Sequence, residues 1–427
     1  MQPDYSSRAA RVMQRIHELA AISEDTDGVT RTFGTPSFLQ GRALVQGWCE
    51  AAGLPTRLDG IGNLRARLAS ANPRAKTFVL ASHIDTVVNA GKFDGPLGVL
   101  MGLDLLESLQ ARQAALPFHV ELIAFSDEEG VRFHTTYLGS AAVAGSFDPG
   151  WLARTDADGI SLARALETMG ADAAQIPSDA ISADEWLGYF ELHIEQGPVL
   201  WERNIPVALV TAIAGQMRAE LTFTGMAGHA GTVPMDMRQD ALCATAEFIL
   251  IAEQFALTHG RGLVATVGKL ALRHAASNVI PGEVVLSLDL RSSDATQLAD
   301  AYGALHHYTE ALAGQRNVAL AWHLVQDTAP VACSETLNET LAEAIADAGH
   351  EVLALVSGAG HDAVPVSAVA PATMLFIRCY KGISHNPLEN VEMADLVAAI
   401  EVADRFLARL AVDVARQHEE VAAGLRR

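Results

Sequence analysis

The stretch of residues 77–99, TFVLASHIDTVVNAGKFDGPLGV, decides the fold. Residues 77–81 are mostly apolar and run directly into the polar cluster SHIDT, a pattern typical of a buried strand that ends at a functional site. After a glycine-rich connection, residues 99–109 are apolar enough for a helix, and residues 119–125 predict a second strand that ends in SDEEG. Strand, helix and strand in this order predict an α/β layer.

A third predicted strand, residues 188–194, also ends in polar residues, at His193, Glu195 and Gln196. Open α/β sheets bind their ligands beyond the carboxyl ends of the strands. Because polar side chains recur at three strand ends, the sequence predicts a functional site at that edge of the sheet.

The chain changes character between residues 214 and 329. Strands at 217–224, 262–273 and 283–291 and helices at 240–255 and 294–313 predict a small α+β unit with an antiparallel sheet and two helices. A helix (335–348), a strand (373–377) and a long helix (393–410) then follow. We therefore predict an α/β domain with a central mixed β-sheet flanked by helices, residues 1–213 and 330–427, interrupted by a smaller inserted domain, residues 214–329.

The composition restricts the possible partners. Lys and Arg total 30 against 51 Asp and Glu, a formal net charge of −21, which disfavours nucleic acid as a partner. No continuous apolar run approaches the roughly 18 residues of a spanning helix, and the N-terminus lacks a signal-peptide core, so neither membrane insertion nor secretion is predicted. The four cysteines lie far apart, as expected in a reducing compartment. We predict a cytoplasmic protein.

Histidines and carboxylates cluster at the predicted strand ends. Each alone is a weak signal, because a single histidine there is more often a hydrogen-bonded structural residue. Together they match the ligands of Zn²⁺, Mn²⁺, Co²⁺ or Ni²⁺, and five such groups suffice for two metals that share a bridging carboxylate. The five are His83, Asp94, Glu129, His193 and His385. Glu128, next to a ligand, is a natural proton carrier.

Seven segments, in chain order, resemble the motif series of the M20 metallopeptidase-like amidohydrolases. The resemblance covers residues 30–395 and is strongest to the hydantoinase/carbamoylase branch, which holds N-carbamoyl-L-amino acid amidohydrolases, β-ureidopropionases and allantoate amidohydrolases. The segments are ASHIDTVVNAGKFDGPLGV, FSDEEGVRF, LHIEQGPVL, GMAGHAGTVPMDMRQDA, NVIPGEVVLSLDLR, SGAGHDA and ISHNPLE.

The resemblance implies two divalent metal ions, zinc or else manganese, cobalt or nickel. It assigns His83, Asp94 and His193 to one ion and Asp94, Glu129 and His385 to the other, with Asp94 bridging. Glu128 becomes the general base and acid: it takes a proton from the attacking water and returns it to the leaving nitrogen. Asp85 would orient the His83 imidazole.

A second set of residues is implied to bind the substrate. His229 is assigned to stabilise the developing oxyanion, and Arg291 offers a planar fork for a carboxylate. Without the motif context, Arg291 would be an ordinary ion pair and Asn278 a turn cap. The implied set is Gln196, His229, Asn278, Arg291, Gly358, Gly360 and His361. The resemblance further implies that the inserted domain is a lid and a homodimerisation domain, with hinges near residues 212–216 and 326–330.

One departure from the family pattern stands out. Trp201 follows GPVL where the family usually has Glu, and Glu202 comes next, so we expect Trp201 at the pocket edge or at a subunit contact. None of the departures removes a metal ligand.

The resemblance implies a binuclear-metal hydrolase that cleaves the ureido or amide C–N bond of an N-carbamoyl-L-amino acid or related ureido carboxylate, releasing ammonia and carbon dioxide. Three alternatives stay open: allantoate as the substrate, an aminopeptidase-like or deacylase-like activity, and a non-catalytic binding protein. LHIEQG argues against the second, and the intact Glu128 and ligand set argue against the third.

Overall fold

The computed structural model of the protein describes residues 4–260 and 262–424, which form two compact units. The first unit comprises Met1–Thr211, Cys333–Leu355 and Gly360–Arg427, and the inserted unit comprises Ala212–Ala332 and Val356–Ala359. The short segment Val356–Ala359 falls outside the range expected for the inserted domain. It joins this unit because Ala214 donates its N–H to the Ser357 carbonyl at 2.8 Å, and Arg291 Nη1 donates to the Gly358 carbonyl at 2.6 Å.

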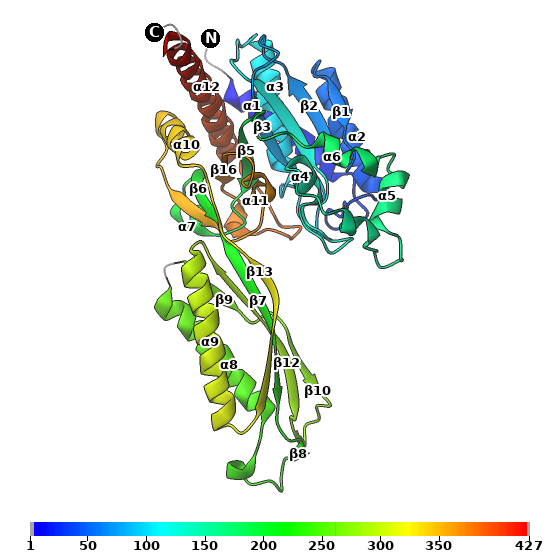
Figure 1. The fold of residues 1–427 in the computed structure, drawn as a ribbon, viewed down its shortest axis with the longest axis vertical. Helices are drawn as coiled ribbons and strands as arrows, with labels where there is room; N and C mark the ends of the chain where they lie inside the picture. The colour runs from blue at the N-terminus through cyan, green and yellow to red at the C-terminus, as the bar shows by residue number, and fades with distance from the viewer. Residues whose placement is uncertain (1–3, 261, 425–427) are drawn as a thin grey trace. The chain divides into compact units, whose positions relative to one another are not determined.

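The first unit is built on a mixed sheet with the strand order β1-β2-β4-β3-β5-β16-β6 (Figure 1). The four central strands run parallel to one another, and β1, β2 and β6 are antiparallel to their neighbours. Two short strands, β14 (Val331–Ala332) and β15 (Ala354–Ser357), also pair with β6. The strand bounds are β1 Thr56–Leu58, β2 Leu64–Leu68, β3 Thr77–His83, β4 His119–Phe125, β5 Trp186–Ile194, β6 Val207–Ile213 and β16 Ala372–Ile377. The predicted α/β class is confirmed.

Long helices cover this sheet. Helix α3 packs on β3 and β5, α12 packs on β16, and both contact α1. Every residue of β3 is buried, as its apolar sequence predicts, and a side chain at Gly98 of α3 would overlap the Leu192 carbonyl of β5. The helices are α1 Tyr5–Ala20, α2 Pro36–Ala51, α3 Pro96–Ala111, α4 Leu138–Val143, α5 Leu162–Thr168, α6 Ile176–Asp179, α7 Val199–Arg203, α10 Glu335–Asp347, α11 Ala363–Val366 and α12 Met393–Gly424.

A buried ion pair joins α1 to α3. Asp104 is fully buried and accepts hydrogen bonds from Arg8 Nε at 2.8 Å and Arg11 Nη2 at 2.5 Å. Asp104→Ala is expected to lower the free energy of unfolding by about 3 kcal/mol, because it leaves the buried Arg8 guanidinium short of a partner. Urea denaturation measures this, with the exposed Arg164→Ala as a control that changes stability by less than about 0.5 kcal/mol. Equal stabilities for the two variants would contradict the expectation.

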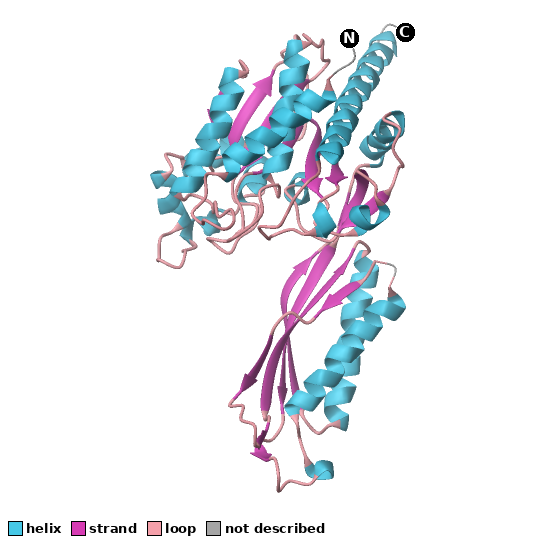
Figure 2. Cartoon of the chain, turned by 180° about the vertical axis from the view of Figure 1, so that it is seen from behind, coloured by secondary structure: helices cyan, strands magenta, loops and turns pink. Residues whose placement is uncertain are grey.

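The inserted unit is an antiparallel five-stranded sheet with two helices on one face (Figure 2). Its strands are β7 Gly215–Thr224, β9 Val264–Thr266, β10 Leu270–Arg273, β12 Glu283–Ser292 and β13 Ala319–Thr328, and its helices are α8 Ala241–His259 and α9 Ala295–Gln315. Two very short strands, β8 (Gly228–His229) and β11 (Val279–Ile280), pair separately.

Two details of the inserted unit differ from the prediction. The strand predicted at residues 262–273 is split into β9 and β10, because the intervening Lys269 exchanges hydrogen bonds with Ser287 of β12. Strand β13 was not predicted from the sequence. Among the described strands it pairs with β7, and its alternation of exposed and half-buried residues is broken by a register shift between Leu324 and Gln326.

Helix α8 is long and apolar enough to cross a membrane by length and composition, with a mean hydropathy of 1.4. Polar residues interrupt its sequence, so it contains no long continuous apolar run. In the structure one face of this helix is buried. Its buried residues recur at helical spacing and pack against the second sheet, and they are Ala241, Ala244, Thr245, Phe248, Ala252 and Phe255.

Candidate metal centre

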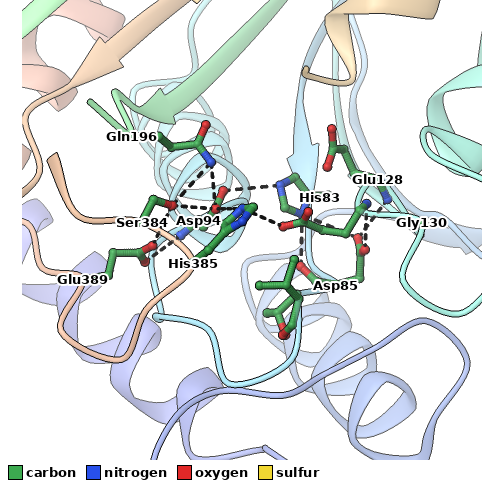
Figure 3. Close-up of polar contacts among 12 residues, drawn as sticks. His83, Asp85, Asp94, Glu128, Gly130, Gln196, Ser384, His385 and Glu389 are labelled. Carbon is green, nitrogen blue, oxygen red and sulfur yellow. Dashed lines mark hydrogen bonds and ion pairs between the residues drawn. The ribbon is translucent and has the colours of Figure 1, made fainter. Parts of the chain in front are cut away.

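The site lies where β3, β4, β5 and β16 reach their carboxyl ends in the first unit (Figure 3). His83 is the last residue of β3, and His193 is the last but one of β5. The loops that follow β3, β4 and β16 supply the remaining predicted ligands, which are Asp94, Glu129 and His385. All five predicted ligands are therefore brought together from segments that are far apart in the sequence.

The two carboxylate oxygens of Asp94 face different histidines. Its Oδ1 lies 3.1 Å from His193 Nε2 and 3.7 Å from His83 Nε2, whereas its Oδ2 lies 3.0 Å from His385 Nε2. Glu129 Oε1 lies 3.4 Å from the same His385 nitrogen. Ligand atoms bound tetrahedrally at roughly 2.0–2.1 Å from a zinc ion are about 3.3 Å apart, so these separations fit side chains that bind metal.

The carboxylates and imidazoles of the site shift one another's pKa. Burial by itself would raise the pKa of Asp94, but hydrogen bonds with His193, His385 and His83 hold it well below its usual value. Asp94 and Glu129 raise the pKa of His385 to about 10. The carboxylates of Asp94 and Glu129 therefore favour a positive charge beside them.

Asp85 has a second role beside the expected contact with the His83 ring. Its carboxylate accepts the backbone N–H groups of Glu128 at 3.1 Å and Glu129 at 3.2 Å. His83 Nδ1 lies 3.0 Å from the Asp85 backbone carbonyl and 3.5 Å from its carboxylate, so the carbonyl is the closer partner of the ring. Asp85 therefore holds the turn that carries Glu128 and Glu129 as well as the His83 ring.

Glu128 lies beside the predicted ligands. One of its carboxylate oxygens, one of Glu129 and a ring nitrogen of His83 lie within 4.8 Å of one another. Burial raises the pKa of Glu128 well above its usual value, and the charge of Glu129 raises it further. A carboxyl group in this position can exchange protons with a water molecule at the ligand cluster.

The buried charge around the cluster fits a bound cation. Asp127 Oδ2 and Glu191 Oε1 are buried and have no hydrogen-bond partner among the described residues. Uncompensated buried carboxylates are costly, and one or two divalent ions would offset their charge. The imidazole and carboxylate donors are also those that such ions accept.

Three of the predicted substrate residues lie in the first unit. Gln196 donates from Nε2 to Asp94 Oδ2 at 2.9 Å, and its amide oxygen is buried without a partner among the described residues. The His361 ring is buried edge-on against the His193 ring at 4.6 Å. Gly360 is needed for a reason that was not foreseen, since a Cβ there would overlap the Tyr137 hydroxyl.

The other predicted substrate residues lie in the inserted unit and fall into two groups. His229 of β8 pairs with Val279 of β11, and the Ala230 N–H donates to the Asn278 carbonyl, so His229 and Asn278 are neighbours. Arg291 lies at the opposite end of β12, near Gly358. The eight residue-to-residue steps of strand from Glu283 to Arg291 span about 26 Å, so His229 and Arg291 of one chain cannot contact the same small molecule.

Arg291 also makes the ion pair that the plain interpretation expected. Its Nε lies 3.0 Å from Asp289 Oδ1, and Arg218 Nε lies 2.8 Å from the other oxygen of Asp289. With Arg218 and Lys269 it lines a cavity of about 740 Å³ that lies wholly in the inserted unit. Glu220 and Asp289 line the same cavity, so its cations exceed its carboxylates by only one.

Sequence reasoning missed two polar residues of the site. Ser384 and Glu389 flank His385 and contact the Asp94 segment, although both stand in the quoted ISHNPLE motif. Trp201 does not line the ligand cluster: its ring packs edge-on against Tyr380 at 5.0 Å, with Arg378 over its face. It thus supports the segment that leads to His385.

The fold and the ligand cluster define the class of protein: a hydrolase with a candidate metal centre on an α/β unit and an inserted α+β unit. Residues 79–409 match the family model described as peptidase family M20/M25/M40, and the chain belongs to this family.

Relatives with named activities match over nearly the full length. The chain is 38% identical to an N-carbamoyl-L-amino acid amidohydrolase of Geobacillus stearothermophilus, over 92% of this chain and 96% of that one. It is also 38% identical to an allantoate deiminase of Arabidopsis thaliana, over 90% and 79%. A hydantoinase/carbamoylase family amidase from Burkholderia multivorans superposes with a TM-score of 0.89 at 32% identity, over 94% and 97%. The protein is therefore a hydrolase of C–N bonds other than peptide bonds.

Proposed function

We propose that the protein hydrolyses the ureido C–N bond of an N-carbamoyl-L-amino acid or a related ureido carboxylate such as allantoate, with two divalent metal ions. The observation that carries this proposal is the division of Asp94 between two ligand groups, one with His83 and His193 and the other with Glu129 and His385. The ureido substrate class is taken from the two named relatives.

Bound divalent ions would polarise the substrate carbonyl and acidify a water molecule. Glu128 accepts the proton of that water at its carboxylate and delivers it to the departing nitrogen, which leaves as ammonia. The Asp85 carboxylate keeps Glu128 in place by accepting the backbone N–H of Glu128. Arg291 is assigned to the substrate carboxylate, which would replace Asp289 at its guanidinium fork. The buried amide oxygen of Gln196 is an acceptor that a ureido N–H would satisfy.

The test is ammonia release by metal-loaded protein from allantoate, N-carbamoyl-β-alanine and several N-carbamoyl-L-amino acids, with a dipeptide and an N-acetyl amino acid as comparisons. We expect release from at least one ureido compound, and the best of them identifies the substrate. Turnover of the dipeptide or the acetyl compound alone would refute the ureido assignment and favour a peptidase or deacylase.

We further propose that the working protein is a homodimer in which His229 and Arg291 at one centre come from different chains. The separation of about 26 Å along β12 supports this, because both residues are assigned to one small substrate. Symmetric association would complete both centres at once.

Co-expressed His229→Ala and Arg291→Ala chains are expected to recover about a quarter of the wild-type activity, although each variant alone is inactive. Half of randomly paired dimers are mixed, and one of the two sites in each is intact. Glu128→Gln paired with His83→Ala is the matched control and should recover nothing, because both residues serve the same chain's centre. Failure of the first pair to recover activity in mixed dimers would contradict the shared site.

A further inference from the structure

Glu389 is a buried carboxyl group that stands four residues after His385. Its side chain is almost inaccessible to solvent, with the residue 2% exposed. Its Oε1 accepts two backbone N–H groups, from Phe93 at 2.7 Å and from Asp94 at 3.0 Å. Its Oε2 lies 3.1 Å from the Ser384 hydroxyl. One side chain is thus bonded to the two loops that supply Asp94 and His385, two of the three members of the second ligand group.

The contact between these loops is close. A side chain at Gly91 would overlap the Glu389 side chain, so the two loops approach each other at a point where only glycine fits. The Ser384 hydroxyl lies 2.9 Å from Asp94 Oδ2, the oxygen that faces His385 (Figure 3). Glu389 therefore spans from the backbone of Asp94 to the residue next to His385.

The first ligand group is anchored differently. His83 and His193 belong to the buried neighbouring strands β3 and β5, whose backbone pairing fixes their spacing. His385 lies in an irregular loop in the left-handed backbone region, with a φ of 53°, and has no strand partner. Only contacts between loops can set its distance to Asp94.

We propose that Glu389 is a positioning residue that holds Asp94 and His385 at the separation a second metal ion requires. The inference rests on the proposed two-metal centre. Glu389 touches neither substrate nor ion and acts through the backbone of Asp94 and through Ser384. Because outer-shell partners of metal ligands commonly contribute 10–100-fold to affinity, its loss should weaken the second ion selectively.

The experiment is a Co²⁺ titration of the metal-free full-length protein, followed by visible absorption and by metal content after gel filtration. The wild type should bind two ions. Glu389→Ala should bind one ion as the wild type does and the second about 10–100-fold more weakly, with a changed Co²⁺ spectrum. Glu389→Gln keeps an acceptor oxygen for the two N–H groups and should restore most of the second-site affinity. The exposed Glu392→Ala, in the same loop, is the matched control and should match the wild type.

Two further variants separate the possible failures. His385→Ala removes a ligand itself and should lose the second ion; if it binds two ions like the wild type, the two-metal centre is wrong. If His385→Ala loses an ion while folded Glu389→Ala binds both with wild-type affinity, the role of Glu389 is overturned and the centre stands. Should Glu389→Ala not fold, Glu389→Asp replaces it, because it keeps the charge but is too short to reach the two N–H groups.

Discussion

Removal of divalent metal ions is expected to lower the hydrolysis of the preferred ureido substrate by about 10³-fold or more, and their return should restore it. Electrostatic stabilisation by bound ions is worth several kcal/mol, and each 1.4 kcal/mol is a factor of ten in rate. The imidazole and carboxylate side chains of the cluster offer no Lewis acid of comparable charge in place of the ions.

The measurement is ammonia release before and after exhaustive chelation and gel filtration, with circular dichroism to confirm that the chelated protein is folded. Thermal unfolding gives an independent readout, because an ion at 100 times its dissociation constant stabilises the folded state by about 2.7 kcal/mol. Full turnover by protein that is free of metal by elemental analysis would disprove the metal centre.

Glu128→Gln is expected to reduce kcat/KM by about 10²–10⁴-fold and to leave the metal content unchanged. An amide of the same size keeps the packing and the backbone bond to Asp85, but it cannot accept a proton from water near neutral pH. The loss is therefore chemical and not structural.

Glu129→Gln is the informative comparison. Glu129 contacts His385 and belongs to the same candidate ligand group, whereas Glu128 is assigned to proton transfer. The Glu129 variant should bind the metal more weakly and recover activity as the metal concentration rises, whereas no concentration rescues the Glu128 variant. Activity of Glu128→Gln within tenfold of the wild type would remove it from the role of general base.

The ligand cluster could be predicted from the sequence because its signals are local. The run from Thr77 into His83 and the run from His119 into Glu128 each show an apolar strand followed by polar residues, and parallel strands end at one edge. The use of both Asp94 oxygens depends on loop geometry that no spacing reveals. Glu389 was missed for the same reason, because its partners are backbone N–H groups almost 300 residues away.

The structure of the inserted unit could be predicted only in part from the sequence. Its sheet and both helices were predicted, because apolar residues alternate along β12 and recur at helical spacing in α8 and α9. The edge strand β13 was not, because its residues are only exposed or half-buried and a register shift between Leu324 and Gln326 interrupts their alternation. The distance between His229 and Arg291 required the pairing of β8 with β11, which places His229 near the start of β12, whereas Arg291 lies near the end of that strand.

The strand order of the first unit bears on how the protein is made. Strand β16 is the last strand of the sheet to be synthesised, yet it lies between β5 and β6, which are made more than 150 residues earlier. A nascent chain on the ribosome therefore carries β5 and β6 with open backbone edges until its final segment emerges, and such edges invite aggregation. A premature stop codon before residue 372 would delete β16 and His385 together. The truncated product should therefore keep its sheet edges open, depend on chaperones and not reach the folded state.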